Sequence, residues 1–133
     1  MALELVPLCT ATVSLAAPIT VSSTLMIGEV TAVNLEGERI RASMKGNAAA
    51  DWLQLSPEGY GTLDVKVTVE TDDGAVIYTH YTGRLQLDTG AVYATPLFHT
   101  GDERYAWLNR IQAVAKGSFS SPETLVYEMF ELR

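Results

Sequence analysis

Apolar and polar residues alternate with a period of two along most of the chain. In residues 63–71 every second residue is leucine or valine up to residue 69, and the residues between them are polar or charged. Successive side chains of a β-strand point to opposite faces, so this pattern predicts a strand with one buried face. No segment keeps the 3.6-residue period of an amphipathic helix. The pattern therefore predicts an all-β protein.

Turn signals divide the rest of the chain into further segments of this kind. Asp72-Asp73-Gly74 ends the first strand in a hairpin turn, because glycine accepts the positive φ that tight turns require. Pro96 cannot donate to a strand ladder, so its segment is expected to be an edge or bulged strand. The other expected strands are residues 5–15, 25–35, 39–45, 52–55, 75–87, 91–98, 105–115 and 125–132.

Eight or nine short strands with a turn about every 8–12 residues are typical of a β-sandwich or a β-barrel. We favour a single antiparallel barrel, because long strands joined by hairpins can close and leave no free edge. An eight-stranded barrel has room for packed side chains or for one small ligand. No linker, repeat or low-complexity tract divides the chain, so we expect one domain, residues 1–133.

The hairpin turn that follows residue 71 decides which face of the sheet His80 occupies. A two-residue turn would place His80 on the valine face, whereas a three-residue turn with a bulge would place it beside Lys66 on the other face. We predict the three-residue turn, because it pairs apolar residues across the hairpin, Val65 with Tyr81 among them.

Composition and charge favour a cytoplasmic protein and argue against nucleic-acid and membrane partners. Hydrophobic residues make up 47% of the chain, which is enough for a core. The formal net charge is -7, and both phosphate backbones and anionic membranes repel such a surface. The single cysteine, Cys9, forms no intramolecular disulfide and is expected in the core. The chain start lacks the basic region of a signal peptide, and no apolar run approaches the ~20 residues of a membrane helix.

The stretch 98–110 is the most unusual part of the sequence. In a strand, Tyr105, Trp107 and Asn109 share one face. Two aromatic rings and an amide suit the wall of a small-molecule pocket, because they offer apolar area and an orienting hydrogen bond. The alternative is that both rings pack in the core and that Asn109 caps a turn.

Asp51 and Trp52 form a second candidate. A carboxylate beside an indole can lie in a pocket that raises its pKa, where it would serve as a general acid or base. The alternative is a solvated carboxylate at the start of a strand, next to a tryptophan that packs in the core.

Four further residues are candidates for acid–base chemistry or ligand contact. Asp64 and Lys66 lie two apart and share a face, so they can form a donor–acceptor pair beside a ligand or simply face solvent. His80 and His99 belong to the residue type that titrates near neutrality, although a lone histidine is more often structural. Zinc-spaced Cys and His clusters and the common catalytic motifs are missing from the sequence, so we expect no metal and no cofactor.

Six short sequence blocks, taken in their order along the chain, are characteristic. They are LVPL at 5–8, ADW at 50–52, SPEG at 56–59, LDVK at 63–66, TDDGAVIY at 71–78 and GDERYAWLNR at 101–110. In this order they resemble the bacterial and fungal family called domain of unknown function 3237. The resemblance covers most of the chain and implies a compact antiparallel β-barrel similar to the allene oxide cyclase type.

The same resemblance draws attention to particular residues. Gly74 is explained by turn geometry, and the others are candidates to line a site. Where the family commonly has an acidic residue this chain has His99, and where arginine is common it has Lys66; the connection at 87–91 is also short. If the acid of the family is a catalytic base, His99 would replace it with a pKa nearer neutrality, or the activity would be altered or lost. The residues drawn out are Asp51, Trp52, Asp64, Thr71, Gly74, Tyr105, Trp107 and Asn109.

Three functions fit these observations. The first is the binding of a small apolar molecule in the barrel lumen, against the aromatic residues and Asn109. The second is a cofactor-free isomerase, cyclase or hydrolase that uses Asp51, Asp64, His80 or His99 as acid or base in the same lumen. The third is a structural homo-oligomer, most simply a dimer, whose lumen is filled by its own side chains.

Overall fold

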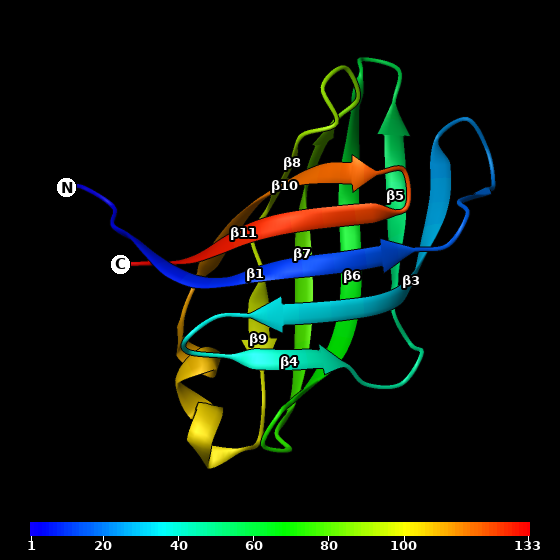
Figure 1. The fold of residues 1–133 in the computed structure, drawn as a ribbon. Helices are drawn as coiled ribbons and strands as arrows, with labels where there is room; N and C mark the ends of the chain where they lie inside the picture. Colours follow the sequence, from blue (N-terminus) through cyan, green and yellow to red (C-terminus); the bar gives the residue numbers. More distant parts are fainter.

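Eleven β-strands and one 3₁₀ helix follow one another along the chain (Figure 1). The computed structural model describes residues 1–133. The helix η1 (Glu103–Arg110) lies between β9 and β10, and no helix has the length and apolar character needed to cross a membrane. The strands are β1 (Leu5–Leu15), β2 (Ile19–Thr20), β3 (Leu25–Glu36), β4 (Arg41–Met44), β5 (Ala50–Ser56), β6 (Tyr60–Thr71), β7 (Val76–Gln86), β8 (Val92–Ala94), β9 (Leu97–His99), β10 (Ala113–Ser121) and β11 (Thr124–Leu132).

The strands close into an antiparallel barrel with eight strand positions. β4 and β5 both pair with β3 and β6, so together they fill one position. β8 and β9 both pair with β7 and fill another. The pairing of β1 with β11 closes the barrel, and Figure 1 shows β11, β1 and β3 crossing in front of β6 and β7. The predicted all-β antiparallel barrel is confirmed.

The register of the β6–β7 hairpin is the predicted one. Val65 lies opposite Tyr81, and Lys66 lies opposite His80. Gly74 has a φ of 92°, the left-handed conformation that this turn needs and that glycine adopts without strain. The three-residue turn is therefore confirmed, and it places Tyr81 on the valine face.

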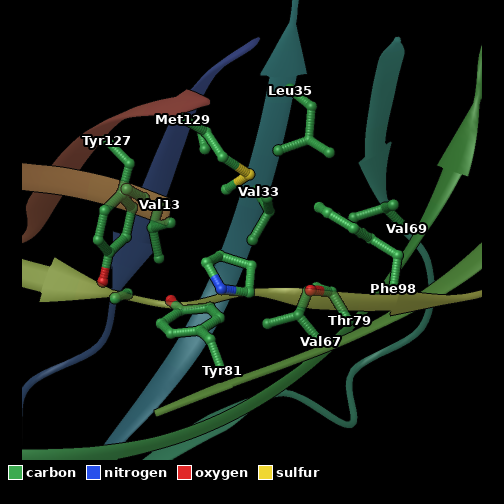
Figure 2. Close-up of a pocket in the computed structure, with 14 residues that line it drawn as sticks. Val13, Val33, Leu35, Val67, Val69, Thr79, Tyr81, Phe98, Tyr127 and Met129 are labelled. Atoms are coloured by element: carbon green, nitrogen blue, oxygen red, sulfur yellow. The ribbon is translucent and has the colours of Figure 1, made fainter. Parts of the chain in front are cut away.

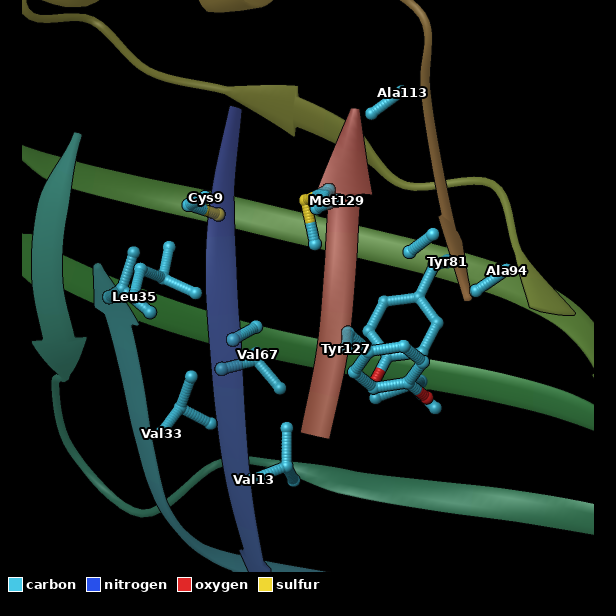
Figure 3. Packing of buried hydrophobic residues seen from close by; sticks show 14 of the residues in the cluster. Cys9, Val13, Val33, Leu35, Val67, Tyr81, Ala94, Ala113, Tyr127 and Met129 are labelled. Carbon is cyan, nitrogen blue, oxygen red and sulfur yellow. The ribbon is translucent and has the colours of Figure 1, made fainter. Parts of the chain in front are cut away.

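The core fills the barrel from the inward face of every long strand. Leu35, Val67 and Met129 come from strands far apart in sequence and point into the same interior (Figure 3). Cys9 is buried among them, as expected, and burial raises the pKa of its thiol to about 12. A thiol in this state remains protonated and serves as a small apolar side chain.

The strand predicted over residues 105–115 is wrong. Residues up to Arg110 belong to η1, and a strand begins only at Ala113. The helix starts because the Asp102 carboxylate accepts a hydrogen bond from the backbone N–H of Arg104 at 2.9 Å, which is a typical N-cap contact. The alternating aromatic residues fit a period of two only by coincidence.

Candidate functional site

The interior of the barrel contains two chambers. The outer one has a volume of about 230 Å³ and the inner one a volume of about 30 Å³. Val13, Tyr81 and Tyr127 line both chambers, so they form the partition between them; Figure 2 shows the inner chamber with these residues. The core side chains that fill the barrel therefore leave space in these two places.

The outer chamber has an almost entirely apolar wall. Asp51 is the only charged residue that lines it, and the only other side chains with a hydrogen-bonding group are Tyr81 and Tyr127. Serine, threonine, cysteine, histidine, lysine and arginine are absent from this wall. Polar chemistry in the chamber is thus confined to one carboxyl group and two phenols.

The Asp51 side chain points inward because of its position in β5. It lies opposite Gly28 on β3 and opposite Val65 on β6, whose side chain is also inward. Gly28 leaves room beside the carboxyl group, since a Cβ built at this position would come no closer than 3.9 Å to the Cβ of Asp51. The carboxylate accepts one hydrogen bond, from the backbone N–H of Asp64 at 3.0 Å.

Burial raises the pKa of Asp51 to about 6. The carboxylate of Asp64 raises this pKa further, while the hydrogen bond from the Asp64 backbone opposes the rise. A carboxyl group with such a pKa is populated in both protonation states near neutral pH, as acid–base catalysis requires. The lumen position expected for Asp51 is what the structure has.

Trp52 does not accompany Asp51 into the lumen. Its side chain lies on the outer face of β5 and is 44% exposed. Neighbouring residues of a strand point to opposite faces, so an inward Asp51 places Trp52 outside. The prediction that both residues contribute to one pocket, or that the indole packs in the core, is wrong for this reason.

Tyr81 and Tyr127 come from β7 and β11 and meet inside the barrel. Their ring centroids are 5.7 Å apart and the rings lie edge to face at 78°. Figure 3 labels both side chains among the buried residues. Burial raises the pKa of Tyr81 to about 12, an effect that the neighbouring Tyr127 hydroxyl partly opposes. Burial also raises the pKa of Tyr127 well above its usual value, and the nearby Asp51 carboxylate raises both. Both phenols therefore stay protonated and can donate hydrogen bonds.

Small residues beside Tyr127 make room for its ring. Gly117 lies opposite Tyr127 on β10, and a Cβ at this position would come within 2.8 Å of two carbons of the ring. Ala94 and Ala115, the next inward residues on β8 and β10, are equally small. The ring can lean across the lumen only because these positions lack larger side chains.

Asp64, Lys66, His80 and His99 lie on the outer surface of the barrel. The Asp64 carboxylate is 2.9 Å from Nε2 of His80, and both side chains are about half exposed. Lys66 and His99 are exposed. None of the four lines either chamber, so the prediction that they act inside the lumen is wrong. The physical reason is the strand period, which turns every second residue of β6, β7 and β9 outward.

Tyr105, Trp107 and Asn109 also lie outside the lumen. A 3₁₀ helix turns by about 120° per residue, so residues two apart point in different directions and the predicted shared face does not exist. Each of the three makes a contact with a neighbouring loop instead. The prediction that they form the wall of a pocket is wrong.

Those contacts fasten η1 to the barrel. The Tyr105 hydroxyl donates to the carboxylate of Asp73 at 3.0 Å, in the β6–β7 turn. Trp107 lies under the guanidinium of Arg39, 4.5 Å from the ring centroid. Asn109 accepts a hydrogen bond from the N–H of Thr100 and donates one to its carbonyl oxygen.

The β6–β7 turn also explains Thr71, another residue that the family resemblance draws out. Its hydroxyl donates to the carboxylate of Asp73 at 2.6 Å and accepts from the N–H of Ala75 at 2.8 Å. These bonds hold the turn in the conformation that Gly74 permits. Thr71 is thus a residue of the turn and has no contact with either chamber.

Tyr81 and Tyr127 are not among the site residues predicted from the sequence, although the sequence contains the signal for one of them. The predicted hairpin register puts Tyr81 on the valine face, where a phenol must bring its hydroxyl group into the interior. Tyr127 alternates with Leu125 and Met129, both of which point inward. Both residues can be predicted from the sequence by looking for a tyrosine on the apolar face of an alternating strand.

No group of three or more His, Cys, Asp or Glu side chains that could hold a metal ion occurs in the structure. The ionic contacts outside the lumen join acidic side chains to basic ones, as between Asp64 and His80 or between Glu131 and Arg39. The outer chamber is a concave, mainly apolar site that contains one carboxyl group and two phenols.

Comparison with known proteins supports the resemblance seen in the sequence. A family model described as protein of unknown function (DUF3237) matches residues 3–95 and 89–132. No curated protein matches the chain.

Solved structures share the fold over almost the whole chain. A beta-barrel like protein from Acinetobacter baumannii AYE is 25% identical, with a TM-score of 0.85 and coverage of 100% of this chain and 98% of the other. A conserved protein of unknown function from Rhodopseudomonas palustris is 21% identical, with a TM-score of 0.90 and coverage of 100% and 99%. An enzyme from Penicillium herquei is 20% identical, with a TM-score of 0.72 and coverage of 99% and 94%.

Proposed function

Because the chain belongs to the DUF3237 family, whose function is unknown, we propose a function from its lumen: it is an enzyme that binds a small, largely apolar molecule in the outer chamber and transfers a proton through Asp51. The observation that carries this proposal is a single charged group, Asp51, on the wall of an otherwise apolar chamber. A structural protein has no need of such an arrangement, because a buried carboxylate without a cation costs stability.

The size and lining of the chamber favour a neutral ligand of one or two rings. An apolar cavity of about 150 Å³ is enough to bind benzene. The outer chamber is larger, at about 230 Å³, and no lysine or arginine on its wall offers a partner for an anionic ligand. The hydrophobic effect supplies most of the affinity, and the three polar side chains orient the molecule.

The carboxyl group of Asp51 suits proton transfer at physiological pH. With a pKa of about 6, its protonated and deprotonated forms differ little in free energy near neutral pH. It can therefore accept a proton as the base and return it as the acid. The similar protein from Penicillium herquei is described as an enzyme, so a barrel of this fold is compatible with catalysis. Fold likeness alone does not transfer a reaction, and the argument for this chain rests on Asp51.

Two measurements test the proposal. The first follows the Asp51 carboxyl carbon by NMR across a pH titration, with and without naphthalene. We expect a pKa near 6 that rises when naphthalene enters, because the ligand displaces water from around the carboxyl group. Gly28→Leu is the control for the site, since its side chain would project into the chamber beside Asp51 and exclude the probe. An ordinary pKa that naphthalene leaves unchanged would contradict the proposal.

The second measurement is turnover of a panel of neutral one-ring and two-ring ketones, esters and epoxides. We expect Asp51→Asn to reduce any activity found by at least 100-fold, as for the loss of a general acid or base. Asp88→Asn is the matched control, because this carboxylate lies in the exposed turn that follows β7 and is not among the groups that act on Asp51. Activity that Asp51→Asn retains, or that Asp88→Asn removes, would place the chemistry outside the chamber.

A further inference from the structure

The phenol groups of Tyr81 and Tyr127 line the same chamber as Asp51. Tyr81 and Tyr127 border both chambers, and Asp51 lines the outer chamber together with them. The Asp51 carboxylate slightly raises the pKa of both phenols. Neither phenol is required to satisfy a backbone group, because neither hydroxyl is bonded to the main chain. The two hydroxyl groups also affect each other, because the Tyr127 hydroxyl lowers the pKa of Tyr81 and the Tyr81 hydroxyl raises that of Tyr127. Both phenols and the Asp51 carboxyl group thus line one largely apolar chamber.

We infer that the substrates are ketones with a removable α-hydrogen, whose carbonyl oxygen Tyr81 and Tyr127 hold while Asp51 takes and returns the α-proton. This inference rests on the proposed function, since it names the substrate class of the same chamber. It assigns Tyr81 and Tyr127 a catalytic role that the sequence analysis did not consider.

The proton transfer balances without a co-reactant. The Asp51 carboxylate removes the α-proton, and the electrons of that C–H bond form a C=C bond while the C=O π electrons move onto oxygen. The resulting enolate accepts hydrogen bonds from the two phenols. The protonated Asp51 then returns the proton to the same carbon, or to a conjugated carbon, which moves a double bond.

The chemistry of the wall separates this reaction from hydrolysis. No serine, threonine, cysteine or histidine lines the outer chamber, so it offers no nucleophile of the kind that hydrolases commonly use. Two neutral donors of high pKa stabilise the charge that develops on a carbonyl oxygen, and removing one such donor commonly costs about 10²–10³ in rate. A pair of this kind with a nearby carboxylate base is one known solution for proton abstraction next to a carbonyl.

The test follows deuterium exchange into 2-tetralone, a two-ring ketone, by proton NMR in deuterium oxide. The wild-type chain is expected to accelerate loss of the C1 proton signal over buffer, and Asp51→Asn is expected to remove the acceleration. Tyr81→Phe and Tyr127→Phe keep the rings, and each is expected to reduce the rate by 10-fold or more. Tyr93→Phe is the matched control, because Tyr93 lies exposed on β8.

A second readout separates binding from catalysis. The dissociation constants of 2-naphthol, which resembles the enol of 2-tetralone, and of naphthalene, which lacks the oxygen, are measured by NMR titration. Tyr81→Phe and Tyr127→Phe are expected to weaken the binding of 2-naphthol about 10-fold and to leave the binding of naphthalene unchanged. The reason is that only 2-naphthol has an oxygen that the phenols can bond.

The outcomes distinguish this inference from the proposed function. One outcome is that naphthalene binds and shifts the pKa of Asp51, but deuterium exchange into 2-tetralone is no faster than in buffer or with Gly28→Leu. This outcome would overturn the ketone assignment and leave the acid–base site in place. Exchange that both tyrosine variants retain would overturn the role of the phenols. Failure of naphthalene and of 2-naphthol to bind at all would overturn both proposals.

Discussion

The environment of Asp51 links its protonation to the stability of the fold. Burial raises its pKa to about 6, whereas an aspartate in an unfolded chain has a pKa near 4. Between these two pH values the native state binds more protons than the unfolded state. The contribution of Asp51 to stability is therefore most favourable below about pH 4 and is lost as the pH rises through 6.

We predict that Asp51→Asn stabilises the protein at pH 8 and not at pH 4. A pKa rise of this size corresponds to at most ~3 kcal/mol, and solvent entering through the open chamber reduces the gain to about 1–2 kcal/mol. The asparagine oxygen can still accept the hydrogen bond from the Asp64 backbone. Urea denaturation of both proteins at the two pH values measures the difference.

The control for this prediction is Asp88→Asn, in the exposed turn that follows β7. It removes the same charge without touching the lumen. A gain of equal size for Asp51→Asn at both pH values, or an equal gain for Asp88→Asn, would show that burial of the carboxylate is not its source.

At the residue scale, the sequence contains enough information to predict much of the site. For Asp51 the sequence leaves two alternatives open, a pocket that raises its pKa or a solvated strand start, and the structure has the first. The strand period should have separated it from Trp52, because adjacent residues face opposite sides. The register that pairs Val65 with Tyr81 likewise implied an inward phenol. These are errors in applying a rule that the sequence already supported.

At the element scale, η1 is the part of the fold that the alternating pattern predicted wrongly. Tyr105, Trp107 and Asn109 alternate with other residues as in a strand. The competing signal was the helix start at Asp102 and Glu103, a capping side chain followed by an acidic residue in the first turn. A short 3₁₀ helix leaves no long apolar period, so contacts with the barrel rather than periodicity decide that it forms.

Asn109 is one of those contacts, and we predict that Asn109→Ala loosens η1 without affecting the lumen. Two hydrogen bonds to Thr100 are lost at a partly exposed site, so unfolding free energy should fall by about 1–2 kcal/mol. Binding of naphthalene should be unchanged, because Asn109 lines neither chamber. Urea denaturation and NMR titration measure the two effects, with Asn47→Ala in an exposed loop as the control. A loss of naphthalene binding in Asn109→Ala alone would return this residue to the site.

At the scale of the whole molecule, one position of the barrel next to β7 is weakly paired. β8 and β9 share it, and each forms only three residue pairs with β7, whereas β6 and β7 pair along their whole length. Pro96 stands between β8 and β9 and has no N–H to donate. Local opening of the barrel is therefore expected there first.

Native-state hydrogen exchange tests this expectation. The protected amides of Val92–Ala94 and Leu97–His99 should exchange through openings of lower free energy than those of β6, by about 2 kcal/mol. The amides of β6 serve as the internal reference, since they lie in the longest hairpin. Exchange of all these amides at one common free energy would mean that the barrel opens only as a unit.

Local pattern in the sequence was sufficient to determine the all-β class, most strand positions and the hairpin register. These depend on the two-residue period and on turn chemistry, which act between neighbours in the chain. Tertiary structure decided the rest. Which inward side chains meet across the lumen, how much space Gly28 and Gly117 leave, and where η1 lies all depend on barrel closure. Closure joins strands distant in sequence, and no local pattern records the distance between Tyr81 on β7 and Tyr127 on β11.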